Sequence, residues 1–574
     1  MENSEFAKIF WNIAELLELK SGNPFKIRAY QKAAQNIENL SDSLAGLYKK
    51  GGRKALKELP GIGQAIADHI EELIKTGKIK KYESLVRQFP KGFIEMMQVP
   101  GIGPKTAFLL KKKLKIDSLA KLRRASAKGL LKGLPGFKEK KIENVKKGLA
   151  LKARVKGRFL LSEADQYATA IVFELNKLKE IDQILPAGSY RRGQETVGDI
   201  DILVTSKKPE AVMDAFTKLP QVERTTAKGP TRSSVILRNG MQADIRVLPP
   251  ENFGAAAHYF TGSKQHNILI REMAVKRGLK ISEYGVMRGN KRLAGKTEAE
   301  IFQAVGLPFI PPELRQGTNE IELAKEGKLP RLIELADIRG DLHAHSNRSD
   351  GGNSIEEMAA AAEELGYEYL AMTDHSVSTR VAGGQTEKKL LKELADIDSI
   401  NSRLKGIRIL KGAEVDILPD GSLDFPDEIL KQLDVVTASV HSNFKMPREK
   451  MTRRIIKALQ NRYVNVLSHP TGRLISKREP YDVDIERVIK AARETGTYLE
   501  VNSYPDRLDL SDIHCRRAKA EGVLLSINTD AHAALQLRLM KYGIMTARRG
   551  WVEKNDVINT RPLAKLLKLL YAKR

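Results

Sequence analysis

Nine histidine and carboxylate residues stand near the ends of apolar runs in the last third of this 574-residue chain, and they include six of its ten histidines. A single histidine at a strand end is more often a hydrogen-bonding residue than a ligand, but six together are hard to explain in that way. Mixed imidazole and carboxylate ligands favour Zn²⁺, Mn²⁺ or Fe²⁺ over Mg²⁺, and nine suffice for two or three ions. Such a cluster suits phosphodiester or phosphomonoester hydrolysis. The set is His343, His345, Asp350, His375, Glu414, His441, His469, Asp530 and His532.

Three aspartates in the middle of the chain form a second candidate centre. Asp199 and Asp201 alternate along the strand pattern GDIDILV, so they project from one face. An Asn-Gly hairpin turn then delivers Asp244 on a neighbouring strand. Three converging carboxylates require cations between them, and two Mg²⁺ ions there would activate a 3′-hydroxyl and neutralise a triphosphate. The alternative is that these aspartates only cap turns at strand ends.

A glycine-bounded turn precedes these aspartates in the segment GSYRRG. The side chains of Ser189 and Arg192, together with the amides of the glycine turns that include Gly188, are suited to holding phosphate oxygens. We therefore expect this turn to bind the phosphates of the substrate.

The N-terminal region repeats one short motif. Leu59-Pro60-Gly61-Ile62-Gly63 recurs as Val99-Pro100-Gly101-Ile102-Gly103, and a basic stretch beginning at Lys105 follows. Residues 105–158 hold nineteen lysines and arginines but three acidic residues, within a net charge of +27. A glycine hairpin between two helices presents free backbone amides to a phosphate without reading any base. Two copies beside a basic stretch favour binding of the DNA backbone over two ordinary turns.

The elements that must position the histidine-rich set alternate as strands and helices after residue 340. Seven apolar runs end in polar residues, as in YLAMTDH and VNVLSHP, and helical patterns lie between them. This rhythm predicts a parallel sheet closed into a barrel, which gathers the ligands at the carboxyl ends of the strands.

Composition excludes several classes of protein. No apolar run approaches the roughly 18 residues of a membrane span, and the acidic N-terminus does not match a signal peptide. The single cysteine, Cys515, excludes an internal disulfide and Cys-based zinc sites. We expect a cytoplasmic protein that has an anionic partner and no membrane contact.

The segment GSYRRGQETVGDIDILV, the strand QADIRVL and the later motif YFTGS resemble family X DNA polymerases, the DNA polymerase beta group, over roughly residues 1–316. The resemblance implies that Asp199, Asp201 and Asp244 bind the catalytic metals. It also implies that the triphosphate of the incoming nucleotide is held by Gly188, Ser189, Arg192 and Gly198, and that its sugar packs against Tyr259, Phe260 and Gly262. Asn267 would contact the base pair, and Arg271 would contact the template strand.

The same resemblance assigns roles in the N-terminal region. Carbonyls of Leu59 and Ile62, and of Val99 and Ile102, match the monovalent Na⁺ or K⁺ sites of the family. Further DNA contacts are expected from Lys26, Tyr30, Lys32, Gly61, Gly63, Gly101, Gly103 and Lys105. The lysine that forms a Schiff base in lyase-active members is replaced by His69, and a second, phosphate-binding lysine by Ala65. Imidazole cannot form that imine, so we expect gap-end binding with weak or absent lyase activity.

Residues from about 337 onward resemble the PHP (polymerase and histidinol phosphatase) domain, and all nine of its ligands are matched. Joined to a polymerase, this implies a bacterial or archaeal 3′-5′ exonuclease and a possible abasic-site endonuclease. Asp374, Asn502 and Arg473 are expected to contact ligands or phosphate.

The expected fold is multidomain α+β and α/β, with helix-hairpin-helix N-terminal domains, a nucleotidyltransferase palm and a distorted seven-stranded (β/α) barrel. We expect six segments: a DNA-end-binding domain (1–85), fingers (86–155), the palm (156–250), a nucleotide-selecting subdomain (251–316), a linker (317–338) and the PHP domain (339–574). The expected function is gap filling in base excision repair, with Mg²⁺, Zn²⁺ or Mn²⁺ as cofactors and gapped or nicked DNA and dNTPs as partners. The alternatives are a small-molecule phosphatase on a DNA-binding module and a non-catalytic DNA-end scaffold.

Overall fold

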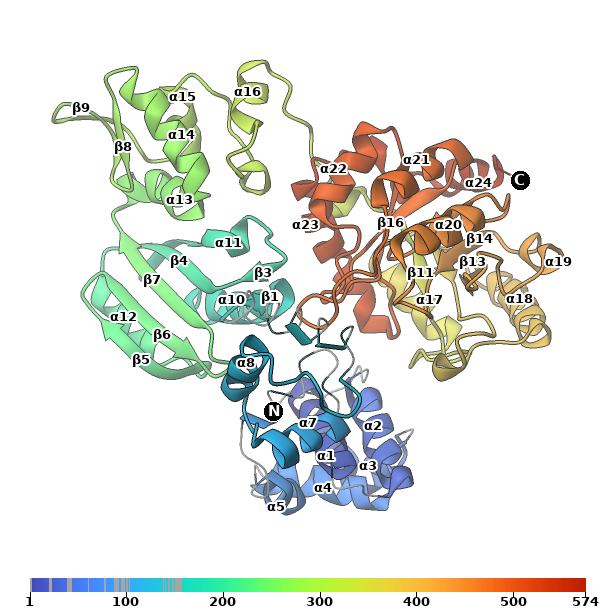
Figure 1. Cartoon of the computed structure of the whole chain (residues 1–574). Helices are drawn as coiled ribbons and strands as arrows, with labels where there is room; N and C mark the ends of the chain where they lie inside the picture. Colours follow the sequence, from blue (N-terminus) through green and yellow to red (C-terminus); the bar gives the residue numbers. More distant parts are fainter. Residues whose placement is uncertain are drawn as a thin grey trace.

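The computed structural model describes residues 3–573, except for 20–22, 39–43, 60, 77–78, 87–91, 94–95, 97–98, 100–101, 103, 138, 140, 143–144, 147–148 and 150–156. Figure 1 shows three groups of elements along the chain: blue N-terminal helices, a cyan to green central part and a yellow to red C-terminal barrel.

The N-terminal group is helical, and its repeated motif folds as the same turn twice. The amide of Ile62 donates to the carbonyl of Leu59 at 3.1 Å, and that of Ile102 to the carbonyl of Val99 at 2.9 Å. Both isoleucines are buried in one apolar core, so each turn anchors the helix that follows it. The helices are α1 (Asn3–Leu19), α2 (Pro24–Glu38), α3 (Leu44–Lys57), α4 (Gln64–Thr76), α5 (Lys80–Val86), α7 (Pro104–Leu114) and α8 (Leu119–Ala127).

The central part is built on a five-stranded sheet in the order β2-β4-β7-β6-β5, in which only β4 and β7 pair in parallel. The predicted hairpin forms, because Gly240 in the Asn-Gly turn adopts φ +87° between β6 and β7. The strands are β2 (Ile181–Pro186), β4 (Asp199–Ser206), β5 (Val222–Lys228), β6 (Arg232–Leu237) and β7 (Gln242–Leu248). A short pair, β1 (Phe159–Leu160) and β3 (Thr196–Val197), lies beside them.

Alternation along β4 assigns its two faces. Ile200, Ile202 and Val204 are buried in one core with α10 (Leu161–Leu175) and α12 (Pro209–Thr217), whereas Leu203 packs with alanines of α13 (Phe253–Thr261). Because Asp199 and Asp201 share the face of Leu203, they open toward α13 and the turn α11 (Gly188–Arg191).

Residues 250–337 complete the central part. The helical elements are η1 (Pro250–Asn252), α14 (Lys264–Val275), α15 (Glu298–Ala304), η2 (Pro312–Leu314), α16 (Glu320–Lys325) and η3 (Leu335–Asp337). An antiparallel sheet contains β8 (Lys280–Ser282), β9 (Gly285–Arg288) and β10 (Lys291–Ala294). The segment expected to be a linker contains α16, whose Glu320 is fully buried and lies 2.9 Å from Nδ1 of the buried His266 on α14.

The C-terminal part is a parallel seven-stranded sheet in sequential order, β11 to β17. Its first and last strands meet, because the amide of His345 donates to Ala531 at 2.8 Å and that of Asp530 to His343 at 2.9 Å. The predicted barrel is therefore nearly closed. Its strands are β11 (Gly340–Ala344), β12 (Tyr369–Met372), β13 (Arg408–Asp416), β14 (Val435–Ser439), β15 (Val466–Leu467), β16 (Tyr498–Asn502) and β17 (Leu525–Asn528).

Helices connect and cover these strands. They are α17 (Ile355–Glu364), η4 (Arg380–Ala382), α18 (Glu387–Asn401), α19 (Asp427–Leu430), α20 (Arg448–Leu459), α21 (Ile485–Thr495), α22 (Asp512–Ala520), η5 (Ala534–Leu539), α23 (Met540–Arg549), η6 (Lys554–Asp556), η7 (Ile558–Thr560) and α24 (Leu563–Tyr571). The predicted capping box forms at the start of α17, where Ser354 and Glu357 bond reciprocally.

The barrel packs directly against the palm. Leu508 and Tyr542 of the barrel belong to the same buried core as α10 and α12. The carboxylate of Asp165 on α10 accepts hydrogen bonds from Tyr190 of α11 at 2.7 Å and from Tyr542 at 2.9 Å, and it also pairs with Lys541. These contacts join α11, the turn that precedes Asp199 and Asp201, to helix α23 of the barrel.

Candidate active sites

The three aspartates of the palm lie together on one face of the neighbouring strands β4 and β7. Asp201 pairs in register with Asp244, and Asp199 lies two residues before Asp201 on the same strand face. Burial, with the negative charges of Asp199 and Asp244, raises the pKa of Asp201 to about 6. One carboxylate oxygen of Asp244 is buried without a hydrogen-bond partner. Mutually repelling carboxylates with a free buried oxygen fit hard divalent cations such as Mg²⁺.

The turn expected to hold phosphates lies against this cluster. Gly188 has φ +65°, and a Cβ atom there would come within 2.6 Å of Oδ2 of Asp201. Only glycine allows such a close approach in this conformation. Arg192 extends from the end of the turn to the carbonyl of Thr261 on α13, and burial lowers the pKa of its guanidinium to about 10. Ser189 lies in the same turn, so the structure brings the expected phosphate-binding residues beside the carboxylates.

The residues expected to select the nucleotide surround this turn. A Cβ on Gly262 would lie 3.1 Å from a guanidinium nitrogen of Arg192, which places the two residues together. Asn267 donates to the carbonyl of Tyr259 at 2.7 Å and keeps a buried amide oxygen without a partner. Phe260 makes an edge contact with Tyr259, with ring centroids 5.0 Å apart.

Two other residues expected at this site, Arg271 and Gly198, contact the rest of it less closely. Arg271 donates to the carbonyl of Asn267 at 3.2 Å, one helical turn along α14. Gly198 directly precedes β4, and a Cβ at this position would meet nothing closer than 3.7 Å, so the space around it does not itself require glycine.

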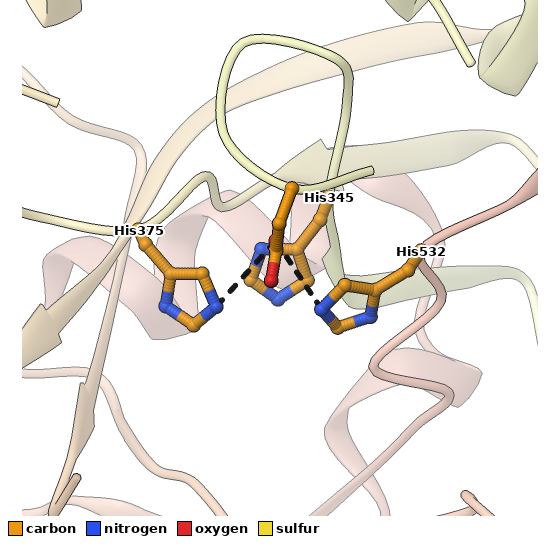
Figure 2. A group of neighbouring side chains, drawn as sticks. His345, His375 and His532 are labelled. Atoms are coloured by element: carbon orange, nitrogen blue, oxygen red, sulfur yellow. Dashed lines mark ion pairs between the residues drawn. The ribbon is translucent and has the colours of Figure 1, made fainter. Parts of the chain in front are cut away.

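The barrel brings all nine expected ligands together. Three groups have ligand atoms within 4.8 Å of one another: His345, Asp350, His375 and His532; His343, His345 and Asp530; and His375, Glu414 and His441. The ninth, His469, lies 3.0 Å from Glu414 through Nε2. Figure 2 shows His345 between His375 and His532, and dashed lines join the rings of His375 and His532 to one carboxylate.

Buried partners orient these ligands in the manner of metal sites. Nδ1 of His343 lies 2.7 Å from the fully buried Glu500, while its Nε2 has no hydrogen-bond partner and faces Glu414 and Asp530 at 3.6 and 3.5 Å. An imidazole held by a carboxylate on one nitrogen and free on the other is a typical metal ligand. The donor set therefore fits two or three ions of the Zn²⁺ or Mn²⁺ type.

The charges of the cluster are mutually dependent. Burial disfavours the charged form of Glu414, but the imidazoles of His441 and His375 hold its pKa well below the usual value. Burial also disfavours charged His532, but the hydrogen bond and negative charge of Asp350 raise its pKa to about 9. Asp530 adopts φ +54°, a left-handed conformation that is unfavourable for aspartate and common at functional sites.

Four further residues of this site were not identified from the sequence. A cavity of about 360 Å³ opens beside the ligands and is lined also by Phe444, Arg478 and Arg507. Nε of Arg507 lies 3.5 Å from Asp530. Glu500 stands in the strand pattern YLEVNS, where the position alternates with buried apolar residues, and that pattern alone could have indicated it.

The three residues expected to support the ligands behave differently from one another. Asn502 donates to Asp530 at 3.1 Å and so positions a ligand. Asp374 accepts from the amide and hydroxyl of Ser346 and holds the loop before Asp350. Arg473 does not line the cavity: it pairs with Glu195 of the palm at 2.8 Å and donates to the carbonyl of Arg507 at 2.9 Å.

The N-terminal residues are described only in part. Lys26 and Lys32 are exposed, and the buried Tyr30 stacks on His69 with the ring centroids 6.1 Å apart. Gly61 lies against Lys32, because a Cβ there would come within 3.1 Å of its Cγ, whereas Gly63 is exposed with open space around it. Gly101, Gly103 and the side chain of Lys105 lie outside the described residues.

Five family models match successive parts of this chain. Residues 1–79 match the helix-hairpin-helix domain and 93–151 the SAM-like helix-hairpin-helix tandem. Residues 158–241 match the DNA polymerase beta palm, 256–316 the DNA polymerase beta thumb and 341–504 the PHP domain. The DNA polymerase/3′-5′ exonuclease PolX of Bacillus subtilis (strain 168) is 39% identical over 567 residues, or 98% of each chain. This chain belongs to the PolX family.

The PHP half of this PolX family member has relatives of its own. A probable phosphatase of Thermoanaerobacter sp. (strain X514) is 31% identical over 231 residues, covering 38% of this chain and 89% of the relative. A probable phosphatase of Acetivibrio thermocellus is 33% identical over 207 residues, covering 34% and 80%. Among the described helices, none is both long and apolar enough to span a membrane.

Proposed function

We propose that this PolX family member is a DNA polymerase that fills short gaps during DNA repair and that its PHP centre removes nucleotides from 3′ ends. The observation that carries this proposal is that one chain assembles two complete ligand sets of different chemistry: three carboxylates in the palm and nine imidazoles and carboxylates in the barrel. Each set retains every ligand that the resemblance to its family predicts.

In the palm, Asp199, Asp201 and Asp244 would hold Mg²⁺. When bound, the ions supply neutralisation of the triphosphate and activation of the primer 3′-hydroxyl. Ser189, Arg192 and the amides at Gly188 would hold the phosphates, because they surround the carboxylates at the turn. Tyr259, Phe260 and Gly262 would pack the sugar, Asn267 would contact the base pair, and Arg271 the template strand.

In the barrel, the nine ligands would hold two or three Zn²⁺ or Mn²⁺ ions. When bound, these ions supply a nucleophile near neutral pH and polarise the phosphodiester. Arg507 is placed to bind the phosphate, since its guanidinium borders the cavity and its charge faces Asp530. Glu500 and Asn502 would keep His343 and Asp530 in position throughout the reaction.

The N-terminal hairpins would bind gapped or nicked DNA through its backbone. Exposed Lys26 and Lys32 suit a 5′-phosphate, and the carbonyls of the two turns suit Na⁺ or K⁺ ions that bridge to DNA. His69 cannot replace the missing lysine, because an imidazole has no primary amine with which to form an imine. Lyase activity is therefore expected to be weak or absent.

A second candidate function is hydrolysis of small phosphomonoesters by the barrel. It is favoured by the match between the barrel and the probable phosphatases named above. The palm would take no part in this hydrolysis, so Asp199→Ala would not change the rate of phosphomonoester turnover.

One experiment separates these functions. A 5′-labelled primer on a one-nucleotide gapped duplex is incubated with Mg²⁺ or Mn²⁺, with and without dNTPs. Asp199→Ala/Asp201→Ala should lose extension alone, and His343→Ala/His345→Ala should lose shortening alone. Absence of both activities from the wild type, with turnover of a phosphomonoester, would instead establish the second candidate.

A further inference from the structure

Two chemically different kinds of residue line the cavity beside the barrel ligands. The imidazoles and carboxylates suit a phosphate. Phe444 and Arg478 also line the cavity, although a metal site has no use for an aromatic ring. The volume of about 360 Å³ is far larger than a phosphate and falls within the range of pockets that hold organic ligands, about 300–1,000 Å³.

Phe444 and Arg478 are flat groups held in one stack. The guanidinium carbon of Arg478 lies 4.4 Å from the centroid of the Phe444 ring. Arg478 also donates from Nε to the carbonyl of Gly472 at 2.9 Å, which fixes the side chain. The Phe444 ring is in turn nearly parallel to Tyr481, with centroids 6.2 Å apart and an interplanar angle of 12°.

Tyr481, the ring that lies parallel to Phe444, is held in place by its neighbours. Tyr481 is buried, and its hydroxyl donates to the carbonyl of Pro470 at 2.6 Å. Gly472 packs so closely that a Cβ there would meet the Tyr481 ring at 2.4 Å. Phe444 itself is only half-buried, so it remains accessible from the cavity while its support is rigid.

Aromatic rings and arginine guanidinium planes are the groups on which proteins stack unpaired bases. A phosphomonoester of a small alcohol would leave such a platform unused. A 3′-terminal nucleotide, by contrast, has a phosphodiester on one side of its sugar and a flat base on the other. The platform lies in the same cavity as the ligands, and stacking accepts every base because each has a π face.

We propose that Phe444 and Arg478 form a stacking platform for the base of the 3′-terminal nucleotide during exonuclease action. The proposal rests on the proposed 3′-5′ exonuclease function and adds the nucleoside subsite. It makes the barrel selective for nucleotides over simple phosphate esters without selecting among the four bases. Phe444 and Arg478 are positioning groups that touch the substrate away from the bond that breaks.

The test pairs a change in the enzyme with the matching change in the substrate. Full-length wild type, Phe444→Leu, Phe444→Tyr and Arg478→Lys are assayed with Mn²⁺ on a single-stranded oligonucleotide that ends in an ordinary nucleotide or in an abasic tetrahydrofuran nucleotide. Leucine keeps the apolar volume but not the ring, tyrosine keeps the ring, and lysine keeps the charge but not the plane.

Loss of one stacked base corresponds to about 5- to 150-fold, so we expect Phe444→Leu to raise KM for the ordinary end by about 10-fold. The abasic end should show a similar rise in wild type and no further rise in Phe444→Leu. Phe444→Tyr should behave as wild type, and Arg478→Lys should resemble Phe444→Leu.

Binding without turnover provides an independent readout. In EDTA, the fluorescence of an oligonucleotide with a 3′-terminal 2-aminopurine should be quenched by wild type and Phe444→Tyr and less by Phe444→Leu. Equal losses of activity on ordinary and abasic ends, or no loss on either, would overturn the proposal. Failure of wild type to shorten any oligonucleotide would instead refute the exonuclease function on which it rests.

Discussion

Replacing Asp201 with asparagine should stabilise the metal-free palm at neutral pH while abolishing nucleotide addition. The pKa of Asp201 rises from 3.8 to about 6 through burial and the charges of Asp199 and Asp244. A carboxyl with a raised pKa holds its proton more tightly in the folded state, so its unfavourable effect is absent below pH 3.8 and grows as the pH rises to about 6. At about 1.36 kcal/mol for each pKa unit, ionised Asp201 costs the folded palm up to about 3 kcal/mol.

Amide hydrogen exchange along β4 and β7 measures this effect in the palm alone. In EDTA at pH 8, D201N should protect these amides more strongly than wild type by about 1 to 3 kcal/mol, because asparagine removes the charge but fills the same space. At pH 4 the difference should nearly vanish. Mg²⁺ should reverse the order at pH 8, since ions that bind the folded carboxylates stabilise wild type.

Asp214→Asn is the matched control. Asp214 lies on α12 of the same domain, but it is exposed, and its hydrogen bond with Lys228 lowers rather than raises its pKa. Its replacement should therefore not increase protection at pH 8. If D201N gives no gain in amide protection in EDTA, or the same gain at pH 4 and pH 8, then repulsion between the carboxylates does not destabilise this site.

Three other changes test other parts of the molecule. Glu500→Gln removes the negative charge that faces His343. Calorimetric titration of the metal-free protein with Mn²⁺ should therefore show about 10- to 100-fold weaker binding, while gap filling persists. An unchanged affinity for Mn²⁺ would contradict the role of Glu500 in orienting His343. Asp165→Ala leaves the hydroxyls of Tyr190 and Tyr542 without the carboxylate that accepts from them, so KM for dNTP should rise several-fold and the melting temperature should fall. Glu174→Ala removes a carboxylate of the same helix that pairs with the exposed Lys177, and it should change neither quantity. Borohydride treatment of the protein with a gapped substrate carrying a 5′-deoxyribose phosphate should trap no covalent adduct, because His69 cannot form an imine; an adduct that is lost on mutation of a nearby lysine would reverse this expectation.

Much of both sites was predictable because their ligands follow local rules. Two-residue periodicity along β4 places Asp199 and Asp201 on one face in any sheet, and the Asn-Gly turn sets where β7 begins. The strand–helix rhythm after residue 340 likewise predicts that ligands following successive strands meet at one end of a barrel. These inferences need only short-range geometry and the direction of the chain.

Other features could not be predicted, because they depend on which distant segments pack together. Arg473 was expected near phosphate, yet its guanidinium is taken by Glu195 of the palm and by the backbone at Arg507. Charge and spacing do not reveal such an interface, since the partners lie 278 residues apart. Residues 306–340 are likewise punctuated by prolines, which predicts a boundary and a linker, but Glu320 of this segment is buried against His266 of α14.

The sequence alone therefore determined the two chemistries of this protein, because the types and periodic spacing of Asp199, Asp201, Asp244 and the histidine-rich set follow from the local geometry of strands and turns. Tertiary structure decided what surrounds those ligands. It brought Glu500 to His343, stacked Arg478 on Phe444 at the cavity, and tied the turn α11 to the barrel through Asp165. The physical reason is that side-chain partners across strands and domains are chosen by packing of the whole chain, which no short sequence pattern encodes.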